Sequence, residues 1–372
     1  MPAIKLTLWF DGSISVNNQI EQAAIGPKRI KKYLVKFLYI YIVYNKCKIL
    51  TLRKNKNTMR IVFMGTPEFA VASLDILMKN NYNVVGVVTV PDKPAGRGQQ
   101  LQQSAIKKYA LDKGLKVLQP EKLKDEQFIN ELRDLKADLQ FVVAFRMLPE
   151  IVWNMPSLGT YNLHGSLLPK YRGAAPINWA IINGETESGV TTFKLKHDID
   201  TGNVLFQDKV QITATTTAGE LHDSLMVAGA NLILKSAKQI ESGDCELKPQ
   251  NDVEAIHAPK IFKETCLINW NNSVKSIYNL IRGLSPYPTA FTTYIDKNNQ
   301  PVSIKLFSSE IENCSHHLKN GEIETDSKTY LKVACSNGFI HIKELQIAGK
   351  KRMTIEEFLR GFKVYQEFKF CV

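Results

Sequence analysis

The sequence predicts an α/β fold in which a doubly wound parallel sheet is followed by a smaller antiparallel barrel. Apolar, β-branched runs alternate with helical patterns of about ten residues after Met59, which favours a parallel sheet with right-handed crossovers. Short strands separated by turns dominate the last part of the chain. The 372 residues also exceed what one hydrophobic core usually fills, so we expect two domains.

The first domain opens with the run MRIVFMG (59–65), which ends in glycine and precedes Pro67 at the start of a helical pattern. This order is typical of a strand, a tight turn and a helix with proline in its first turn. By the same criteria we expect further strands at 82–90, 116–119, 138–145 and 160–164, and helices at 67–77, from Ser104 onward and at 125–135. Such sheets bind ligands at the carboxyl ends of their strands, near the reversal of strand order.

A hairpin and a long helix complete the first domain. The runs GVTTFKL (189–195) and NVLFQDKVQI (203–212) flank the polar segment HDIDTG, and a helical pattern spans 217–241. We therefore place the first domain at 59–242, a polar linker at 243–263 and the second domain at 264–372. In the second domain we expect a helix at 273–283 and strands at 290–295, 302–308, 330–334 and 339–346.

Residues 1–58 differ in character from the rest of the chain. They carry eleven Lys and Arg residues against Asp11 and Glu21, and thus +9 of the net charge of +12. The basic character of the whole chain therefore says little about its folded part. The apolar run 34–44 is interrupted by Lys36 and is too short to span a bilayer. We predict a basic extension outside the fold, with Met59 as the true start, and a peripheral membrane tether is the alternative.

The spacing of the cysteine and histidine residues disfavours a zinc-binding protein and a disulfide-bonded protein. The six cysteines (47, 245, 266, 314, 335 and 371) include no C-x-x-C pair, and the seven histidines include no H-x-x-x-H pair. These patterns argue against a structural zinc site and against a disulfide framework, and they fit a reducing compartment. We expect a cytoplasmic protein without a metal cofactor.

The stretch TYNLH (160–164) places two polar side chains at the end of a predicted strand. Asn162 and His164 alternate with period two, so they face the same side of the sheet, and Asp200 follows in a loop. A carboxamide can stabilise a developing oxyanion, an imidazole can move protons near neutral pH, and a carboxylate can orient the imidazole. This set suits direct acyl transfer between two bound substrates. An isolated Asn-X-His pair is nevertheless more often structural than catalytic.

The glycine-containing segments do not predict nucleotide binding. FMGTPEF has one glycine where a dinucleotide-binding fold needs G-x-G-x-x-G, and GRG (96–98) lacks the Lys-Ser/Thr of a phosphate-binding loop. We interpret the polar segment 91–103 as a mobile loop that carries the basic residues Lys93 and Arg97.

Five motifs, taken together, resemble one enzyme family. The segments FMGTPEFAV, VTVPDKPAGRG, NLHGSLLPKYRGAAPINWAI, DIDTG and AGKKRM occur between Met59 and about Gly361, in the order found in methionyl-tRNA formyltransferases. NLHGSLLPKYRGAAP is similar to the signature of folate-dependent formyltransferases in general, whereas GTPEFA with PDKPAGRG is similar to the tRNA-specific branch. The resemblance implies a Rossmann-like formyltransferase domain followed by an OB-like β-barrel, the oligonucleotide-binding fold.

The resemblance also implies a reaction and a set of site residues. The expected donor is 10-formyltetrahydrofolate, and the expected acceptor is the α-amino group of methionyl-initiator tRNA. Asn162 and His164 would stabilise the oxyanion, His164 would also move protons, and Asp200 would hold a water and tune His164. The expected folate-binding residues are Ser166, Leu167, Leu168 and Pro169 of the SLLP turn, with Arg146, Met147 and Leu148. Arg146 departs from many bacterial members, which carry glycine there.

For the tRNA, the resemblance implies two binding regions. The loop 91–101, above all Arg97 and also Lys93, is expected to contact the acceptor end. The barrel is expected to present a basic face to the acceptor arm, with Lys260, Lys263 and Arg282 near its entry. We expect the enzyme to be a monomer that does not act at a membrane.

Two alternatives of different kinds remain. One is a related formyltransferase that acts on a small amine, or a formyl-folate hydrolase, although such enzymes need neither the barrel nor the PDKPAGRG loop. The other is a non-catalytic RNA-binding protein with a degenerate enzyme fold, which the intact Asn162, His164 and Asp200 disfavour.

Overall fold

The computed structural model describes residues 7–8, 14–15, 59–95, 100–295, 300–361 and 370. The chain divides into two units, Met1–Lys56 and Asn57–Val372. In the first unit, the described residues form the short antiparallel strands β1 (Thr7–Leu8) and β2 (Ile14–Ser15).

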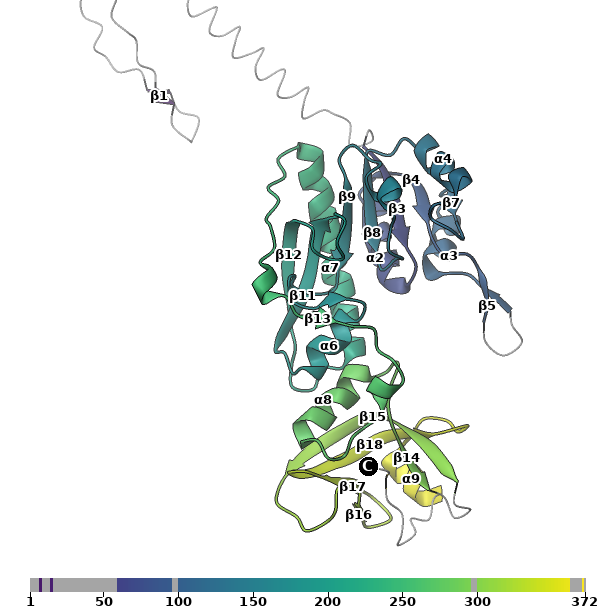
Figure 1. Cartoon of the computed structure of the whole chain (residues 1–372), viewed down its shortest axis with the longest axis vertical. Helices are drawn as coiled ribbons and strands as arrows, with labels where there is room; N and C mark the ends of the chain where they lie inside the picture. The colour runs from purple at the N-terminus through teal and green to yellow at the C-terminus, as the bar shows by residue number, and fades with distance from the viewer. Residues whose placement is uncertain are drawn as a thin grey trace, which may run out of the picture. The chain divides into compact units, whose positions relative to one another are not determined.

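A seven-stranded sheet forms the first half of the second unit, with the strand order β12-β11-β9-β8-β3-β4-β7 (Figure 1). The neighbouring strands β9, β8, β3, β4 and β7 pair in parallel. Strand β11 pairs antiparallel with both β9 and β12. Their bounds are β3 (Arg60–Gly65), β4 (Asn83–Val88), β7 (Val117–Leu118), β8 (Leu139–Val143), β9 (Thr160–His164), β11 (Glu187–Lys194) and β12 (Val204–Gln211). The predicted strands and the predicted hairpin are therefore confirmed.

Helices cover both faces of this sheet, because its central strands are apolar on both sides. On β3, Ile61 and Phe63 pack into one core with α2 (Glu68–Lys79), α3 (Ala105–Asp112) and α7 (Ala218–Ser242). Val62 and Met64 point to the opposite face and pack with α4 (Glu126–Asp134) and α5 (Glu150–Trp153). Two cores thus hold the sheet rigidly from both sides.

The strand order reverses between β3 and β8. From β3 the chain builds outward through β4 to β7, and it then crosses back to add β8 and β9 on the other side of β3. The carboxyl ends of β3, β8 and β9 therefore diverge at the place where such sheets bind ligands.

A six-stranded antiparallel sheet forms the second half of the unit and packs around its own core. Its order is β14-β15-β18-β17-β16, with β19 paired to β18. Trp270 is fully buried in this core and stacks on Phe370, with ring centroids 5.6 Å apart. The bounds are α8 (Val274–Leu284), β14 (Ala290–Ile295), β15 (Pro301–Asn313), β16 (Ile323–Thr325), β17 (Leu331–Cys335), β18 (Gly338–Ile347), β19 (Met353–Thr354) and α9 (Ile355–Gly361). The sheet forms a half-barrel, which agrees with the smaller antiparallel barrel that the sequence predicts.

The segment predicted as a linker is fastened to the first sheet's domain. Its strand β13 (His257–Ala258) pairs in parallel with β10 (Arg172–Gly173). Gly173 has φ +125°, and a Cβ there would lie 2.6 Å from the carbonyl oxygen of Ala258, so this contact requires glycine. Two short 3-10 turns, η1 (Asp252–Glu254) and η2 (Glu264–Cys266), flank the strand.

The helix α6 (Pro176–Ile182) follows β10 and packs against α8 of the second sheet's domain (Figure 1). Of the helices in the described residues, none combines the length and the apolar character needed to cross a membrane.

Candidate active site

A cleft of about 670 Å³ opens at the carboxyl ends of β3, β8 and β9. Its wall comes from the segments that follow these strands, from the start of α6 and from the loop between β11 and β12. The lining residues include Pro67, Phe69, Phe145, Arg146, Met147, Leu148, Trp153, Asn162, His164, Asn178, Leu195, Asp200 and His222. This is the position that the reversal of strand order predicts.

The structure brings the three predicted catalytic residues to this cleft. Asn162 and His164 occupy alternate positions at the end of β9, and Asp200 reaches the cleft from the β11–β12 loop. Nδ1 of His164 lies 3.8 Å from Oδ2 of Asp200, and both side chains are almost buried. Nε2 of His164 lies 2.8 Å from the carbonyl oxygen of Tyr171, which suits an N–H donor on that nitrogen. The ring is thus fixed at two sides.

The backbone around Asp200 is held in an unusual conformation by a residue that the sequence did not identify. Asp200 has φ +53°, and its Oδ2 accepts a hydrogen bond of 2.9 Å from the N–H of Gly173. Gln250 of the linker donates from Nε2 to the carbonyl oxygens of Asp200 and Gly202, at 2.9 and 2.7 Å. Its Oε1 accepts two hydrogen bonds from Arg172. No local signal marks Gln250, because its partners are distant in sequence.

Arg146 forms part of the opposite wall. Its guanidinium donates to the carbonyl oxygens of Glu121 and Pro120, at 2.9 and 2.7 Å, and burial lowers its pKa. Its Nε is buried and has no partner among the described residues. The neighbouring Met147 is 76% exposed at the cleft, and Leu148 is buried. A largely apolar wall of this kind fits a flat heterocycle.

The SLLP turn follows β9 and is hydrogen-bonded to β11. Ser166 and Leu168 are buried, and neither they nor Leu167 and Pro169 line the cleft. The hydroxyl of Thr191 accepts from the N–H of Leu168 at 3.1 Å and donates to the carbonyl oxygen of Ser166 at 2.6 Å. These hydrogen bonds tie the turn to β11 beside the end of β9. The expected contact of this turn with the folate stays a prediction.

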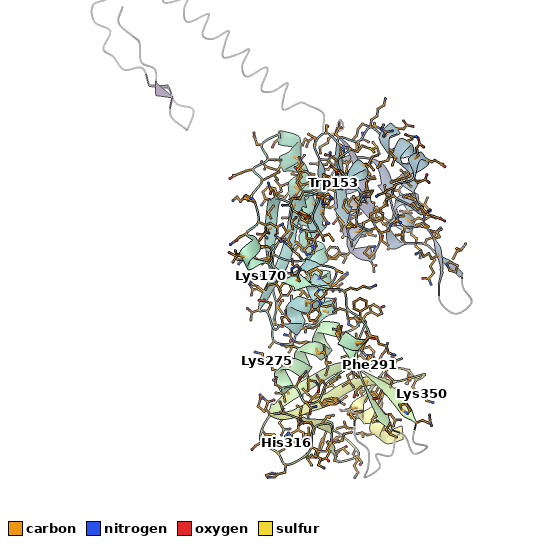
Figure 2. All side chains as sticks on the ribbon, viewed as in Figure 1. Trp153, Lys170, Lys275, Phe291, His316 and Lys350 are labelled. Atoms are coloured by element: carbon orange, nitrogen blue, oxygen red, sulfur yellow. The ribbon has the colours of Figure 1, made fainter. Side chains whose placement is uncertain are left out.

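The predicted tRNA-binding residues lie in three different settings. Lys93 is exposed in β5 (Lys93–Ala95), which pairs with β6 (Gln100–Gln102), so the expected loop is a hairpin. Arg97 lies outside the described residues. Lys260 and Lys263 are exposed, and their ammonium groups lie 5.6 and 6.0 Å from the ring centroids of Phe262 and Phe291. Figure 2 labels Phe291 on the second sheet's domain.

Arg282 is placed differently from the prediction. It is only 7% exposed, and burial lowers its pKa. It donates to the carbonyl oxygen of Thr216 at 2.8 Å and to Oδ1 of Asn279 at 2.9 Å. Its guanidinium therefore joins α8 to the segment before α7, and it is too buried to contact a tRNA phosphate.

Comparison with known proteins identifies the family. The formyl transferase family model matches residues 59–236, and the model of the formyl transferase C-terminal domain matches residues 260–363. A Bacteroides fragilis protein named methionyl-tRNA formyltransferase is 54% identical over 318 residues, which cover 84% of this chain and 98% of the relative. The chain belongs to the methionyl-tRNA formyltransferase family.

Further similarities agree with this membership. The methionyl-tRNA formyltransferase of Phocaeicola vulgatus is 56% identical over 314 residues, which cover 83% of this chain and 97% of the relative. A solved structure of the sugar 3N-formyl transferase WlaRD has a TM-score of 0.57 at 23% identity, covering 79% of this chain and 100% of that one, and supports the fold. As a family member, the chain is a one-carbon transferase enzyme. The described residues contain no cluster of His, Cys, Asp and Glu that could hold a metal.

Proposed function

We propose that the cleft transfers the formyl group of 10-formyltetrahydrofolate to the α-amino group of methionyl-initiator tRNA. The observation that carries this proposal is the meeting of Asn162, His164 and Asp200 in one cleft, at the switch point of the sheet. The family membership supplies the donor and the acceptor. The reaction would take place in the cytoplasm, on a monomer.

The arrangement of these residues supports a direct transfer. The amine attacks the formyl carbon, a new C–N bond forms, and negative charge develops on the formyl oxygen. Asn162, whose side chain lines the cleft, donates a hydrogen bond from its carboxamide to that oxygen. His164 takes the proton that the amine loses and returns it to N10 as the bond between the formyl carbon and N10 breaks. The Asp200 carboxylate, 3.8 Å from Nδ1 of His164, orients the imidazole.

The folate ring would lie along the apolar wall. Phe145, Met147 and Leu148 supply its surface, together with Trp153 and Leu195. The Arg146 guanidinium is held at this wall by the carbonyl oxygens of Glu121 and Pro120, so the arginine that replaces the more common glycine is compatible with folate binding.

Basic residues at two places would hold the tRNA. Arg97 and Lys93 belong to the β5–β6 region, and Lys260 and Lys263 follow the linker. We expect Arg97→Ala to raise the KM for methionyl-tRNA while leaving folate affinity unchanged, because phosphate and acceptor-end contacts do not involve the folate wall. Steady-state kinetics with each substrate varied in turn provide the measurement, and an equal loss for both substrates contradicts the assignment.

The deciding experiment supplies 10-formyltetrahydrofolate with charged initiator tRNA and measures formylmethionine released from the tRNA. Formylmethionyl-tRNA is the expected product. Formate without formylated tRNA would indicate a hydrolase. Transfer only to small amines would indicate a different acceptor, and folate binding without turnover would remove the enzymatic proposal.

A further inference from the structure

One polar residue of the cleft has its partner in the other domain. Asn178 lies in the first turn of α6 and lines the same cleft as Asn162 and His164. Its Nδ2 donates a hydrogen bond of 2.8 Å to the carbonyl oxygen of Gly283 in α8. Within the described part of the chain, its Oδ1 has no hydrogen-bond partner. The carboxamide is therefore fixed by its nitrogen, and its oxygen stays available.

The close approach of the two helices explains why this bond can form. A Cβ at Gly283 would lie 2.7 Å from Cγ1 of Ile182 and 3.3 Å from the carbonyl oxygen of Asn178. Both atoms belong to α6, so the helices can meet at this distance only because residue 283 has no side chain.

The start of α6 is fixed from the same direction. The N–H groups of Ala174 and Ala175 both donate to the carbonyl oxygen of Ala258, at 2.9 and 3.2 Å. Nε1 of Trp179 donates to the carbonyl oxygen of Pro259 at 2.7 Å. The linker and α8 together thus set where this wall of the cleft stands relative to His164.

We propose that Asn178 is an acceptor-positioning residue, whose carboxamide oxygen accepts a hydrogen bond from the attacking amine and whose orientation is set by Gly283. The inference rests on the proposed function. An amine needs an acceptor that holds it with its lone pair toward the formyl carbon. His164 takes the proton of one of the two N–H groups of the amine, and the Asn162 carboxamide donates to the formyl oxygen, so the second N–H group of the amine still needs an acceptor. Asn178 lines the cleft with its amide nitrogen held by Gly283, and its Oδ1 would supply that acceptor.

The first test is Asn178→Ala, assayed with methionyl-tRNA and 10-formyltetrahydrofolate. The loss of one hydrogen bond should raise the KM for methionyl-tRNA by about two- to tenfold. The Kd for tetrahydrofolate, measured by fluorescence titration, should stay within about twofold. Trp179→Phe is the matched control, because it removes the neighbouring bond to Pro259 but does not line the cleft. An unchanged KM in Asn178→Ala, or an equal rise in Trp179→Phe, overturns the proposal.

The second test asks whether the other domain aims the side chain. Gly283→Ala lies outside the cleft, and its methyl group would push α8 away from α6. Its KM for methionyl-tRNA should rise as in Asn178→Ala, with intact tetrahydrofolate binding, and the double variant should show no further rise. If the rises in KM of the two single variants add up in the double variant, Gly283 does not act through Asn178 and this part of the proposal is overturned. If the wild-type protein forms no formylmethionyl-tRNA, the proposed function itself fails, which is a different result from an active enzyme that tolerates Asn178→Ala.

Discussion

At the scale of single residues, the chemistry depends on donors that are already in place before the substrates bind. His164 is held between the carbonyl of Tyr171 and the carboxylate of Asp200, and Asp200 is itself held by the N–H of Gly173. Because these contacts are made within the protein, little reorganisation is needed when charge develops on the formyl oxygen.

Replacing either donor should therefore slow the reaction strongly. We expect Asn162→Ala and His164→Ala each to lower kcat by roughly two to four orders of magnitude, as for lost oxyanion donors and general acids. Single-turnover formylation of methionyl-tRNA is the measurement, with the Kd for tetrahydrofolate as the control for folding. Near-normal turnover in both variants would show that the catalytic groups lie elsewhere.

At the scale of elements, the SLLP turn acts as a support for β9. Thr191 of β11 is fully buried, and its hydroxyl bonds to Ser166, Leu168 and Gln207. Thr191→Val would remove the hydroxyl that bonds the carbonyl oxygen of Ser166 and the N–H of Leu168, and should cost about 1–3 kcal/mol of the free energy of unfolding. Denaturant unfolding measures this cost. Thr215→Val, at an exposed position, should be nearly neutral, and a similar loss in both variants would argue against the bracing role.

The sheet of the second domain carries a pH-sensitive ion-pair cluster. The hydrogen bond from His341 lowers the pKa of Glu312 below its ordinary value of 4.5, and Lys332 adds to the effect. The Glu312 carboxylate therefore stabilises the fold above about pH 4.5, and this contribution is lost as the pH falls through the lowered pKa. Thermal unfolding should show wild type above Glu312→Gln at pH 7 and a smaller gap near pH 3. A constant gap would exclude this origin.

The sequence was sufficient for elements whose signals are local. The strand 160–164 has the predicted bounds, and Ser104 accepts the N–H of Lys107 as the predicted helix start requires. The pairing of β5 with β6 was missed, because it depends on a partner strand rather than on periodicity. The roles of Gln250 and Arg282 were also missed, since the carbonyl oxygens of Asp200 and Thr216 that they bond lie 50 and 66 residues away.

At the scale of the whole molecule, Arg282 joins the two domains. We expect Arg282→Met to lower the free energy of unfolding by about 1–3 kcal/mol, because the carbonyl of Thr216 and the amide of Asn279 lose a charged donor. Denaturant unfolding and the KM for methionyl-tRNA should be measured on the same preparation. Unchanged stability together with lost tRNA affinity would restore the original sequence-based assignment of this arginine.

The fastening of the linker has a consequence for how the polypeptide could be divided. Gly243 and Asp244 are exposed just after α7, whereas Leu247, Gln250 and β13 downstream all contact the catalytic part. A cut at this point would sever one covalent bond and none of these contacts. Two separately produced fragments would therefore still contact each other through these residues. The fragment that carries the half-barrel would also contain Gln250, which fixes the backbone of Asp200.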